Sequence, residues 1–336
     1  MSAGEGLGWP AGSATGVGSM PGTDPDETAR LVLGELTGLP FLPELPARGA
    51  PSDLAGRTSA LLVDLSVDLQ PSGWRLVDRP SRDSSRARDA LARDLDALEQ
   101  AAEGAAPALL KVQAAGPWTL AATLELTRGE KALSDSGAVR ELAASLGEGL
   151  RLHLADLRRR LPGTGLLLQL DEPALPAVLS ARVPTSSGYA TLRAPQPQTV
   201  VDVLREVLEA GEDPLVHCCA PHPPVRLLRK AGARSLSLDA TLLTDADDDA
   251  LGEAVEAGAG LLLGCVAATD APLPAVDAVL TPVRRLWQRL GFPAQDLPRT
   301  VVITPTCGLA GASPAYAKQA LQLCVRAGQA LLDEPL

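Results

Sequence analysis

The amino-acid sequence predicts an α/β protein built as a single (β/α)8 (TIM) barrel. Eight short apolar runs recur along the chain, each too brief for a helix, and segments with helical periodicity lie between them. Dividing 336 residues by eight runs gives 42 residues per unit, which is room for a strand, a helix and two loops. Strands that alternate with helices indicate βαβ units and a parallel sheet, and eight such units favour a closed barrel.

The predicted strands are near-continuous apolar runs that end in a small, polar or reactive residue. Runs of this kind are typical of parallel strands that are covered on both faces. The eight predicted strands are Thr15–Ser19, Ala60–Asp64, Ala108–Gln113, Gly165–Asp171, Pro214–His217, Ser235–Asp239, Gly260–Cys265 and Val301–Thr304.

The segments between these runs carry apolar residues at helical spacing. The predicted helices are Asp24–Leu36, Arg86–Ala102, Ala138–Leu161, Thr199–Ala210, Pro223–Ala231, Asp247–Ala257, Ala275–Leu290 and Pro314–Leu332. The Pro-rich stretch Pro40–Pro51 is interpreted as an elaborated loop near the barrel mouth, in the position of a lid. Since no linker divides the chain, we expect one domain over residues 1–336.

Composition excludes several classes of function. The net charge is −11, and only eight residues are aromatic, so neither nucleic acid nor an anionic membrane surface is an expected partner. No apolar run is long enough to span a membrane, and the N-terminus lacks a signal-peptide pattern. Five cysteines, an odd number, argue against a disulfide framework. We therefore expect a cytoplasmic protein.

Polar and reactive side chains gather where the predicted strands end. In a (β/α)8 barrel this edge carries the active site. The residues there are Ser19, Asp64, Gln113, Asp171, His217 with Cys219, Asp239, Cys265 and Cys307.

Four of these residues form a candidate metal site. His217 and Cys219 point to the same side of a strand because side chains alternate there, and Cys307 adds a second thiolate on a turn that contains glycine. Asp239 offers a carboxylate oxygen. Imidazole, thiolate and carboxylate are zinc ligands, so we expect Zn²⁺. The alternative is a hydrogen-bonded core histidine with buried, inert cysteines.

Two other motifs suit a small substrate. Asp171 and Glu172, in QLDEPAL, end a strand, so a carboxylate there would face the barrel mouth and bind an ammonium group; the alternative is a helix cap. The turn GVGSMPGT, which contains Gly18 and Ser19, offers backbone amides to a carboxylate. We expect no functional role for His153 and His222, and a core position for Cys324. For Cys265, a position in the lining of the site and a position outside it both stay open.

Taken in order along the chain, these motifs resemble the catalytic C-terminal barrel of cobalamin-independent methionine synthase, in a wider group that includes uroporphyrinogen decarboxylase. VGSMPGT is similar to the first-strand turn of the family, QLDEPAL to its fourth-strand motif, VHCC to its His-x-Cys pair and TPTCGL to its last zinc cysteine. SLSLD stands where the family has a glutamate ligand. The matches span nearly the whole chain.

The resemblance implies a zinc ion held by His217, Cys219 and Cys307, with Asp239 in place of the usual glutamate. It implies that Ser19 helps to hold the substrate carboxylate and Asp171 its amino group. Asp239 is one methylene shorter than glutamate, so the fourth bond is expected to be long or replaced by water. The full-length synthase has an additional N-terminal folate-binding barrel, for which this chain has no room.

The predicted function is zinc-dependent methyl transfer to a thiol, with homocysteine as the substrate and Asp171 and His217 as catalytic residues. Three alternatives stay open: another zinc-dependent thiol alkylation, a decarboxylation of the uroporphyrinogen type, and a non-catalytic zinc protein. The decarboxylase needs no metal, so the ligand pattern speaks against it.

For the methyl donor the sequence suggests a corrinoid. Methylfolate carries its methyl on a tertiary amine, a poor leaving group, and an acidic chain with few aromatic rings offers little to hold it. Methylcobalamin, free or on a partner protein, already has an activated methyl group, so we expect it to be the better donor.

Overall fold

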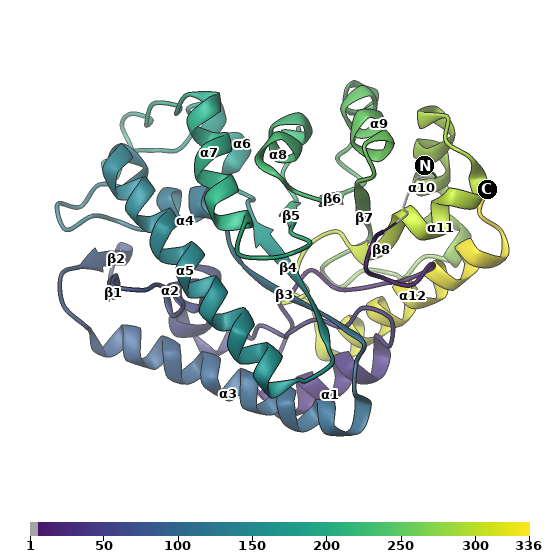
Figure 1. Ribbon diagram of the computed structural model, residues 1–336, viewed down its shortest axis with the longest axis horizontal. Coiled ribbons are helices and arrows are strands. Elements are labelled where there is room, and N and C mark those ends of the chain that lie inside the picture. The colour runs from purple at the N-terminus through teal and green to yellow at the C-terminus, as the bar shows by residue number, and fades with distance from the viewer. Residues whose placement is uncertain (1–5) are drawn as a thin grey trace.

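The computed structural model describes residues 6–336 and contains a curled parallel sheet surrounded by helices (Figure 1). Residues 1–5, the start of the segment without a signal-peptide pattern, lie outside the described part. The sheet has the order β3-β4-β5-β6-β7-β8. Its strands are β3 (Leu109–Ala115), β4 (Gly165–Asp171), β5 (Leu215–Cys218), β6 (Ser235–Asp239), β7 (Gly260–Val266) and β8 (Val301–Pro305).

Two irregular segments close this sheet into a barrel. Residues 13–20, the strand-1 segment, pair with β8, where the Thr15 N–H donates to the Ile303 carbonyl at 3.1 Å. Residues 40–44, the strand-2 segment, pair with β3 through the Leu42 N–H, which donates to the Lys111 carbonyl at 2.9 Å. The Glu44 N–H donates to the Gly18 carbonyl at 3.1 Å and joins the two segments. The predicted (β/α)8 fold class is therefore confirmed.

The predicted second strand, Ala60–Asp64, is wrong. Residues 60–64 follow the short helix α2 (Leu54–Ser59) as a turn, and Asp64 has a left-handed φ of 58°, which an extended strand does not allow. The strand-2 segment, which we interpreted as part of a loop, occupies the place instead. Pro40 and Pro43 lack N–H donors, so the segment pairs too sparsely to look like a strand in the sequence.

The eight predicted helices are all present. They are α1 (Pro25–Glu35), α3 (Arg82–Ala105), α5 (Ser136–Arg160), α7 (Pro197–Leu208), α8 (Val225–Ala231), α9 (Asp248–Glu256), α10 (Val276–Leu290) and α12 (Pro314–Asp333). The α1 helix begins as the sequence indicates, because the Asp24 carboxylate accepts hydrogen bonds from two backbone N–H groups of its first turn.

Several small elements were not predicted. They are the antiparallel hairpin β1 (Ser66–Gln70) and β2 (Gly73–Val77), and the short helices α2, α4 (Pro117–Thr123), α6 (Leu175–Leu179) and α11 (Leu297–Thr300). Leu54, the first residue of α2, lines the pocket at the barrel mouth that is described below.

The barrel interior is apolar at one end and polar at the other. Trp9 and Leu39 pack with inward-facing strand residues at the amino ends of the strands, namely Leu167, Leu215, Leu262 and Val302. Further along the same strands the inward residues are polar and buried, namely Lys111, Gln113, Gln169, Asp171, His217 and Ser237. Burying so many polar groups is unfavourable unless they are paired, so this end of the interior is built for something other than stability.

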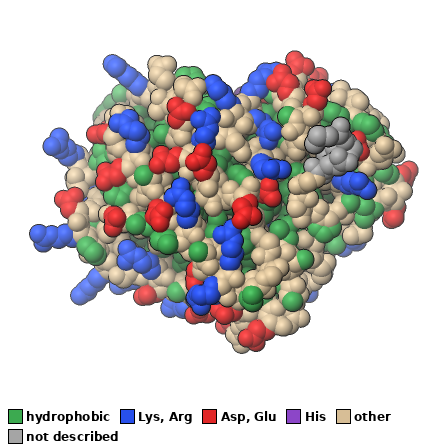
Figure 2. Space-filling view, in the orientation of Figure 1, with side chains coloured by type: hydrophobic (Ala, Val, Ile, Leu, Met, Phe, Trp, Pro, Cys, Tyr) green, Lys and Arg blue, Asp and Glu red, His purple; other side chains and the backbone are tan. Residues whose placement is uncertain are grey.

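On the face shown in Figure 2, acidic and basic side chains are mixed, without a continuous basic patch. Within residues 6–336, no helix combines the length and apolarity needed to cross a membrane.

Candidate functional site

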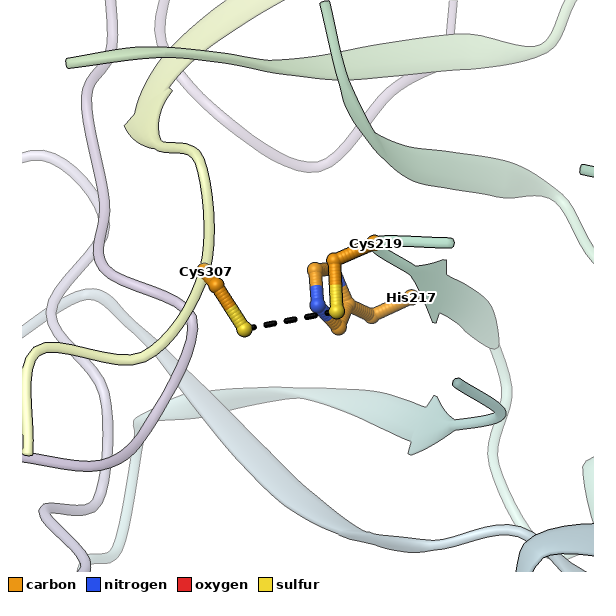
Figure 3. Close-up of side chains that lie close together, drawn as sticks. All are labelled: His217, Cys219 and Cys307. Atoms are coloured by element: carbon orange, nitrogen blue, oxygen red, sulfur yellow. Dashed lines mark hydrogen bonds between the residues drawn. The ribbon is translucent and has the colours of Figure 1, made fainter. Parts of the chain in front are cut away.

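His217, Cys219 and Cys307 come together at the barrel mouth. His217 lies on β5, Cys219 directly follows that strand, and Cys307 lies in the loop after β8 (Figure 3). One potential ligand atom from each lies within 4.8 Å of the others, and the two sulfur atoms are 3.3 Å apart. The predicted meeting of these three side chains is thus found.

The imidazole of His217 is held with one nitrogen free. Its Nδ1 is 2.9 Å from the Ser237 hydroxyl, whereas its Nε2 is buried and has no hydrogen-bond partner among residues 6–336. An unpaired buried polar atom costs about 1–3 kcal/mol, so an imidazole nitrogen left unpaired beside two thiols needs an explanation. A soft metal ion supplies one, because one imidazole nitrogen and two thiolates are a zinc-type donor set whose histidine is oriented through its other nitrogen. These residues fit zinc.

Asp239 lies outside this cluster. It ends β6, but its Oδ1 accepts hydrogen bonds from the Thr241 N–H at 2.9 Å and the Thr241 hydroxyl at 2.6 Å. Within the described residues, the group of potential metal ligands contains only the other three side chains. A fourth bond from Asp239 stays a prediction, and it needs the carboxylate to leave Thr241.

A small pocket adjoins the cysteines. Its volume is about 180 Å³, close to the roughly 150 Å³ cavity that takes one benzene molecule. Its lining joins both predicted motifs to the metal cluster: Val17, Gly18, Ser19, Glu44, Pro46, Ser52, Leu54, Asp171, Pro173, His217, Cys219, Cys307 and Gly308. Only a small substrate fits such a space.

The two carboxylates of the QLDEPAL motif have separate surroundings. Asp171 lines the pocket and accepts a hydrogen bond of 2.6 Å from the Gln169 amide, and burial raises its pKa to about 7. Glu172 instead accepts from the N–H groups of Trp118 and Thr119 and from the Thr119 hydroxyl, at 2.7–2.9 Å. Burial raises the pKa of Glu172 to about 7 as well. Hence Asp171 faces the substrate space, and Glu172 fastens the start of α4.

The first-strand turn, predicted to hold a carboxylate, lies at the edge of the same pocket. Gly18 and Ser19 line the pocket, and among the described residues their backbone N–H groups have no hydrogen-bond partner. The Leu309 N–H donates to the Ser19 carbonyl at 2.7 Å. A Cβ atom at Gly308 would lie 2.0 Å from the Ser19 hydroxyl, so the Cys307 loop and the turn are in close contact.

Glu44 is a pocket residue that the sequence did not reveal. It lies in the strand-2 segment, its side chain is 8% exposed, and Arg57 lies 3.5 Å away. Burial raises the pKa of Glu44, while the charges of Arg57 and Lys111 act in the opposite direction. A single acidic residue inside the apolar, Pro-rich stretch FLPELP was the available signal.

The remaining strand-end residues lie elsewhere. Gln113 is buried behind the turn, where its amide donates to the Leu42 carbonyl, and Asp64 lines a separate surface depression. Cys265 does not line the pocket, and Cys324 is in the core, as expected. His153 is buried in α5, while His222 sits on an exposed turn with a φ of 56°. All five cysteines are free thiols.

Comparisons with known proteins agree with this geometry. The family model for the catalytic domain of cobalamin-independent synthase matches residues 12–330. A solved B12-independent methionine synthase from Shewanella sp. W3-18-1, in complex with selenomethionine, is similar with a TM-score of 0.61 and 11% identity, covering 97% of this chain and 98% of that one. This likeness supports the fold.

Two further structures are much less similar. The Amycolatopsis orientalis BexX/CysO complex gives a TM-score of 0.36 at 12% identity, covering 99% of this chain and 95% of that one. A 2,3-dimethylmalate lyase gives 0.37 at 13% identity, covering 90% and 80%. Neither carries an argument. A search of curated proteins found no match.

Proposed function

The chain belongs to the family of cobalamin-independent synthase catalytic domains, and from this premise we propose that it transfers a methyl group to the sulfur of homocysteine to form methionine. One observation carries the proposal: a His–Cys–Cys cluster, two carboxylates and a turn with free amides line the same pocket of about 180 Å³. A small amino acid with a thiol side chain needs these three kinds of group.

His217, Cys219 and Cys307 would hold a zinc ion, with Asp239 as the proposed fourth ligand. Bound zinc supplies Lewis-acid chemistry that lowers the pKa of a coordinating thiol, so that the sulfur is a nucleophile at neutral pH. The Ser237 hydroxyl would contribute by holding the imidazole through Nδ1, which leaves Nε2 available as the ligand atom. Cysteine ligands donate electron density, which preserves the nucleophilicity of the substrate sulfur.

The remaining pocket residues bind the amino-acid end of the substrate. The amides of Gly18 and Ser19, with the Ser19 hydroxyl, hold the carboxylate. Asp171 and Glu44 pair with the ammonium group. Burial has taken water away from both carboxylates, and the ammonium group gives them hydrogen-bond donors in its place. These contacts direct the thiol toward the cysteines and fix its orientation, which is how binding groups away from the reacting atoms contribute to rate.

The corrinoid donor expected from the sequence is not supported, because the matching family is described as cobalamin-independent. We propose methyltetrahydrofolate instead. Its N–CH₃ bond breaks as the S–CH₃ bond forms, and the thiol proton ends on the donor nitrogen. The five free thiols, two of them metal ligands, suit a reducing compartment, so we also propose that the protein is cytoplasmic.

The test is a methyl-transfer assay on the 336-residue chain, after zinc analysis of the purified protein. We expect one zinc per chain and formation of methionine from homocysteine, which would also show that this barrel suffices. Zinc without turnover on any thiol would favour a non-catalytic metal protein. Full methyl-transfer activity in metal-free protein would overturn the proposed role of zinc.

A further inference from the structure

Behind Glu44 lies a chain of four buried charges. The Glu44 carboxylate is 3.5 Å from the Arg57 guanidinium, Arg57 makes a close contact with the Asp94 carboxylate, and Arg48 contacts the other Asp94 oxygen at 2.6 Å. The side chains of Glu44, Arg57 and Asp94 are each at most 8% exposed, and that of Arg48 is 14% exposed. Two positive and two negative charges alternate, so the network is neutral.

Stability does not explain this network. Removing several ions from water costs more than their mutual attraction usually returns, and apolar side chains of similar volume are often at least as stabilising. The Arg57 Nη2 is even buried without a hydrogen-bond partner. The network has no net charge and its burial is unfavourable, and one of its members, Glu44, lines the pocket. Its effect on Glu44 is therefore a better explanation for it than stability.

Only one member of the network reaches the substrate space. Glu44 lines the pocket, whereas Arg57, Asp94 and Arg48 do not. The backbone of Glu44 is fixed at both groups: its N–H donates to the Gly18 carbonyl at 3.1 Å and its carbonyl accepts from the Met20 N–H at 2.8 Å. These bonds leave the long side chain free to rotate, so the direction of the carboxylate depends on what the side chain itself contacts.

Arg57 is well placed to direct this carboxylate because it is tied to the regular part of the barrel. The next residue, Thr58, accepts a hydrogen bond of 2.8 Å from the Ala115 N–H at the end of β3. Asp94, which holds the far side of the guanidinium, lies on the long helix α3. With Nη1 bonded to Asp94, the planar guanidinium presents its Nε to Glu44 at 3.5 Å, an ion-pair contact that draws the carboxylate to one side; a lysine ammonium would keep the charge without this fixed orientation.

We propose that Arg57, held by Asp94, is a positioning residue that directs the Glu44 carboxylate into the pocket and so makes the site select thiols that carry an α-ammonium group. This inference rests on the proposed function for the identity of the pocket's ligand. It concerns recognition, however, and can be measured by binding alone.

The experiment compares two ligands that differ only in the ammonium group. Homocysteine and 4-mercaptobutyrate share the thiol and the carboxylate, and calorimetry gives the affinity of each for the zinc-loaded protein. Four proteins are compared: the unchanged chain, Arg57→Met, Arg57→Lys, and Arg226→Met as the control. Arg226 makes an exposed ion pair with Glu253 on the outer helices, far from the pocket lining.

We expect the unchanged protein and the Arg226→Met variant to prefer homocysteine. Arg57→Met should lose about ten-fold or more of that preference, the factor equal to about 1.4 kcal/mol, while the affinity for 4-mercaptobutyrate and the zinc content stay the same. Arg57→Lys should recover part of the preference because it keeps the charge but not the fork. Circular dichroism confirms that each variant is folded.

Three outcomes would overturn the inference: equal affinities for both ligands in the unchanged protein, an unaltered preference in a folded Arg57→Met, or equal losses for both ligands, which mark a purely structural role. If Arg57→Met fails to fold, the folded Arg57→Lys decides, and an unaltered preference there counts against positioning. Selective binding without methyl transfer would sink the proposed function and leave this inference standing.

Discussion

The two sides of the barrel contribute different groups to the pocket. The regular side, β3 to β8, carries the His–Cys–Cys cluster and Asp171 on strands that pair side by side and on the residues that follow them. The irregular side, residues 13–20 and 40–44, carries Gly18, Ser19 and Glu44 on a backbone with only a few ladder hydrogen bonds. Under the proposed function, the metal would be held by the regular side and the amino-acid end of the substrate by the backbone amides of the irregular side.

This contrast follows from what each task requires. Metal ligands must keep their distances within tenths of an ångström. The paired strand β5 carries His217 directly, and Cys219 and Cys307 lie within two residues of the ends of β5 and β8. A carboxylate site needs N–H groups that point at the ligand, and a fully paired strand has none to spare. The irregular side is therefore a binding surface, and its prolines and glycines are the means by which it avoids pairing.

The largest expected effect breaks the regular side. Cys219→Ser or Cys307→Ser should lower zinc affinity by more than about 100-fold, beyond the loss caused by removing a partner of a ligand, and methyl transfer should disappear. Cys218→Ser is the matched control, because Cys218 faces the helix-side core and should keep its metal. Atomic absorption on the three purified proteins measures this, and a full complement of zinc in Cys219→Ser would show that the ligands are misassigned.

A smaller effect on the same side concerns the orientation of the imidazole. Ser237→Ala removes the hydrogen bond between the Ser237 hydroxyl and Nδ1 of the His217 ring. Zinc affinity should fall by about 10–100-fold, as is typical when a ligand loses its outer partner. Competition with a chelator gives the affinity, and an unchanged value would indicate that the ring is held by packing alone.

A substitution at Gly308 tests whether substrate binding on the irregular side can be weakened without loss of zinc from the regular side. A methyl group there would displace the Ser19 hydroxyl, so Gly308→Ala should raise the KM for homocysteine by about ten-fold while zinc content is unchanged. Steady-state kinetics with metal analysis measures both quantities. If zinc is lost together with substrate affinity, the two sides form one mechanical unit.

Much of this organisation could be predicted from the sequence, and the failures are physical in origin. The runs at Gly165–Asp171 and Ser235–Asp239 are found as strands with the predicted bounds, because buried parallel strands need continuous apolar side chains. The strand-2 segment could not be found in this way, since Pro40 and Pro43 remove donors and shorten the pairing. The prediction of a strand at Ala60–Asp64 was wrong because this segment packs against α5, near Ser145 and Gly149, instead of pairing with another strand.

The same reasoning explains the result at the site. The sequence could predict the meeting of four residues because strand ends converge in any such barrel; they are His217, Cys219, Cys307 and Asp171. Glu44 was missed together with its strand. Arg57 and Asp94 were missed because their partners are remote in the sequence and only the folded chain brings them together.

The smallest expected effect concerns a residue outside both sides of the barrel, His153, and the pH dependence of stability. His153 is buried in α5, and burial lowers its pKa to about 4. The unfolded chain binds a proton near pH 6.5 and the folded chain does not, so stability falls as the pH drops from about 6.5 toward 4. At pH 5.5 the loss is about 1 kcal/mol.

His153→Gln should reduce this pH dependence and leave zinc and homocysteine binding unchanged. Thermal unfolding from pH 7.5 to 5.0 compares the variant with the unchanged chain. Identical pH profiles for the two proteins would show that other groups dominate acid sensitivity.

Barrel closure has a consequence for how the protein is made. Thr15 and Ile303 pair across almost the entire chain, and Cys219 meets Cys307 across a shorter but still large separation. Contacts this remote in sequence form slowly and late, because a long loop must be closed before they stabilise anything. A nascent chain that does not yet include β8 and Cys307 can neither close the barrel nor assemble the three-residue cluster. Metal loading would then report that the barrel has closed.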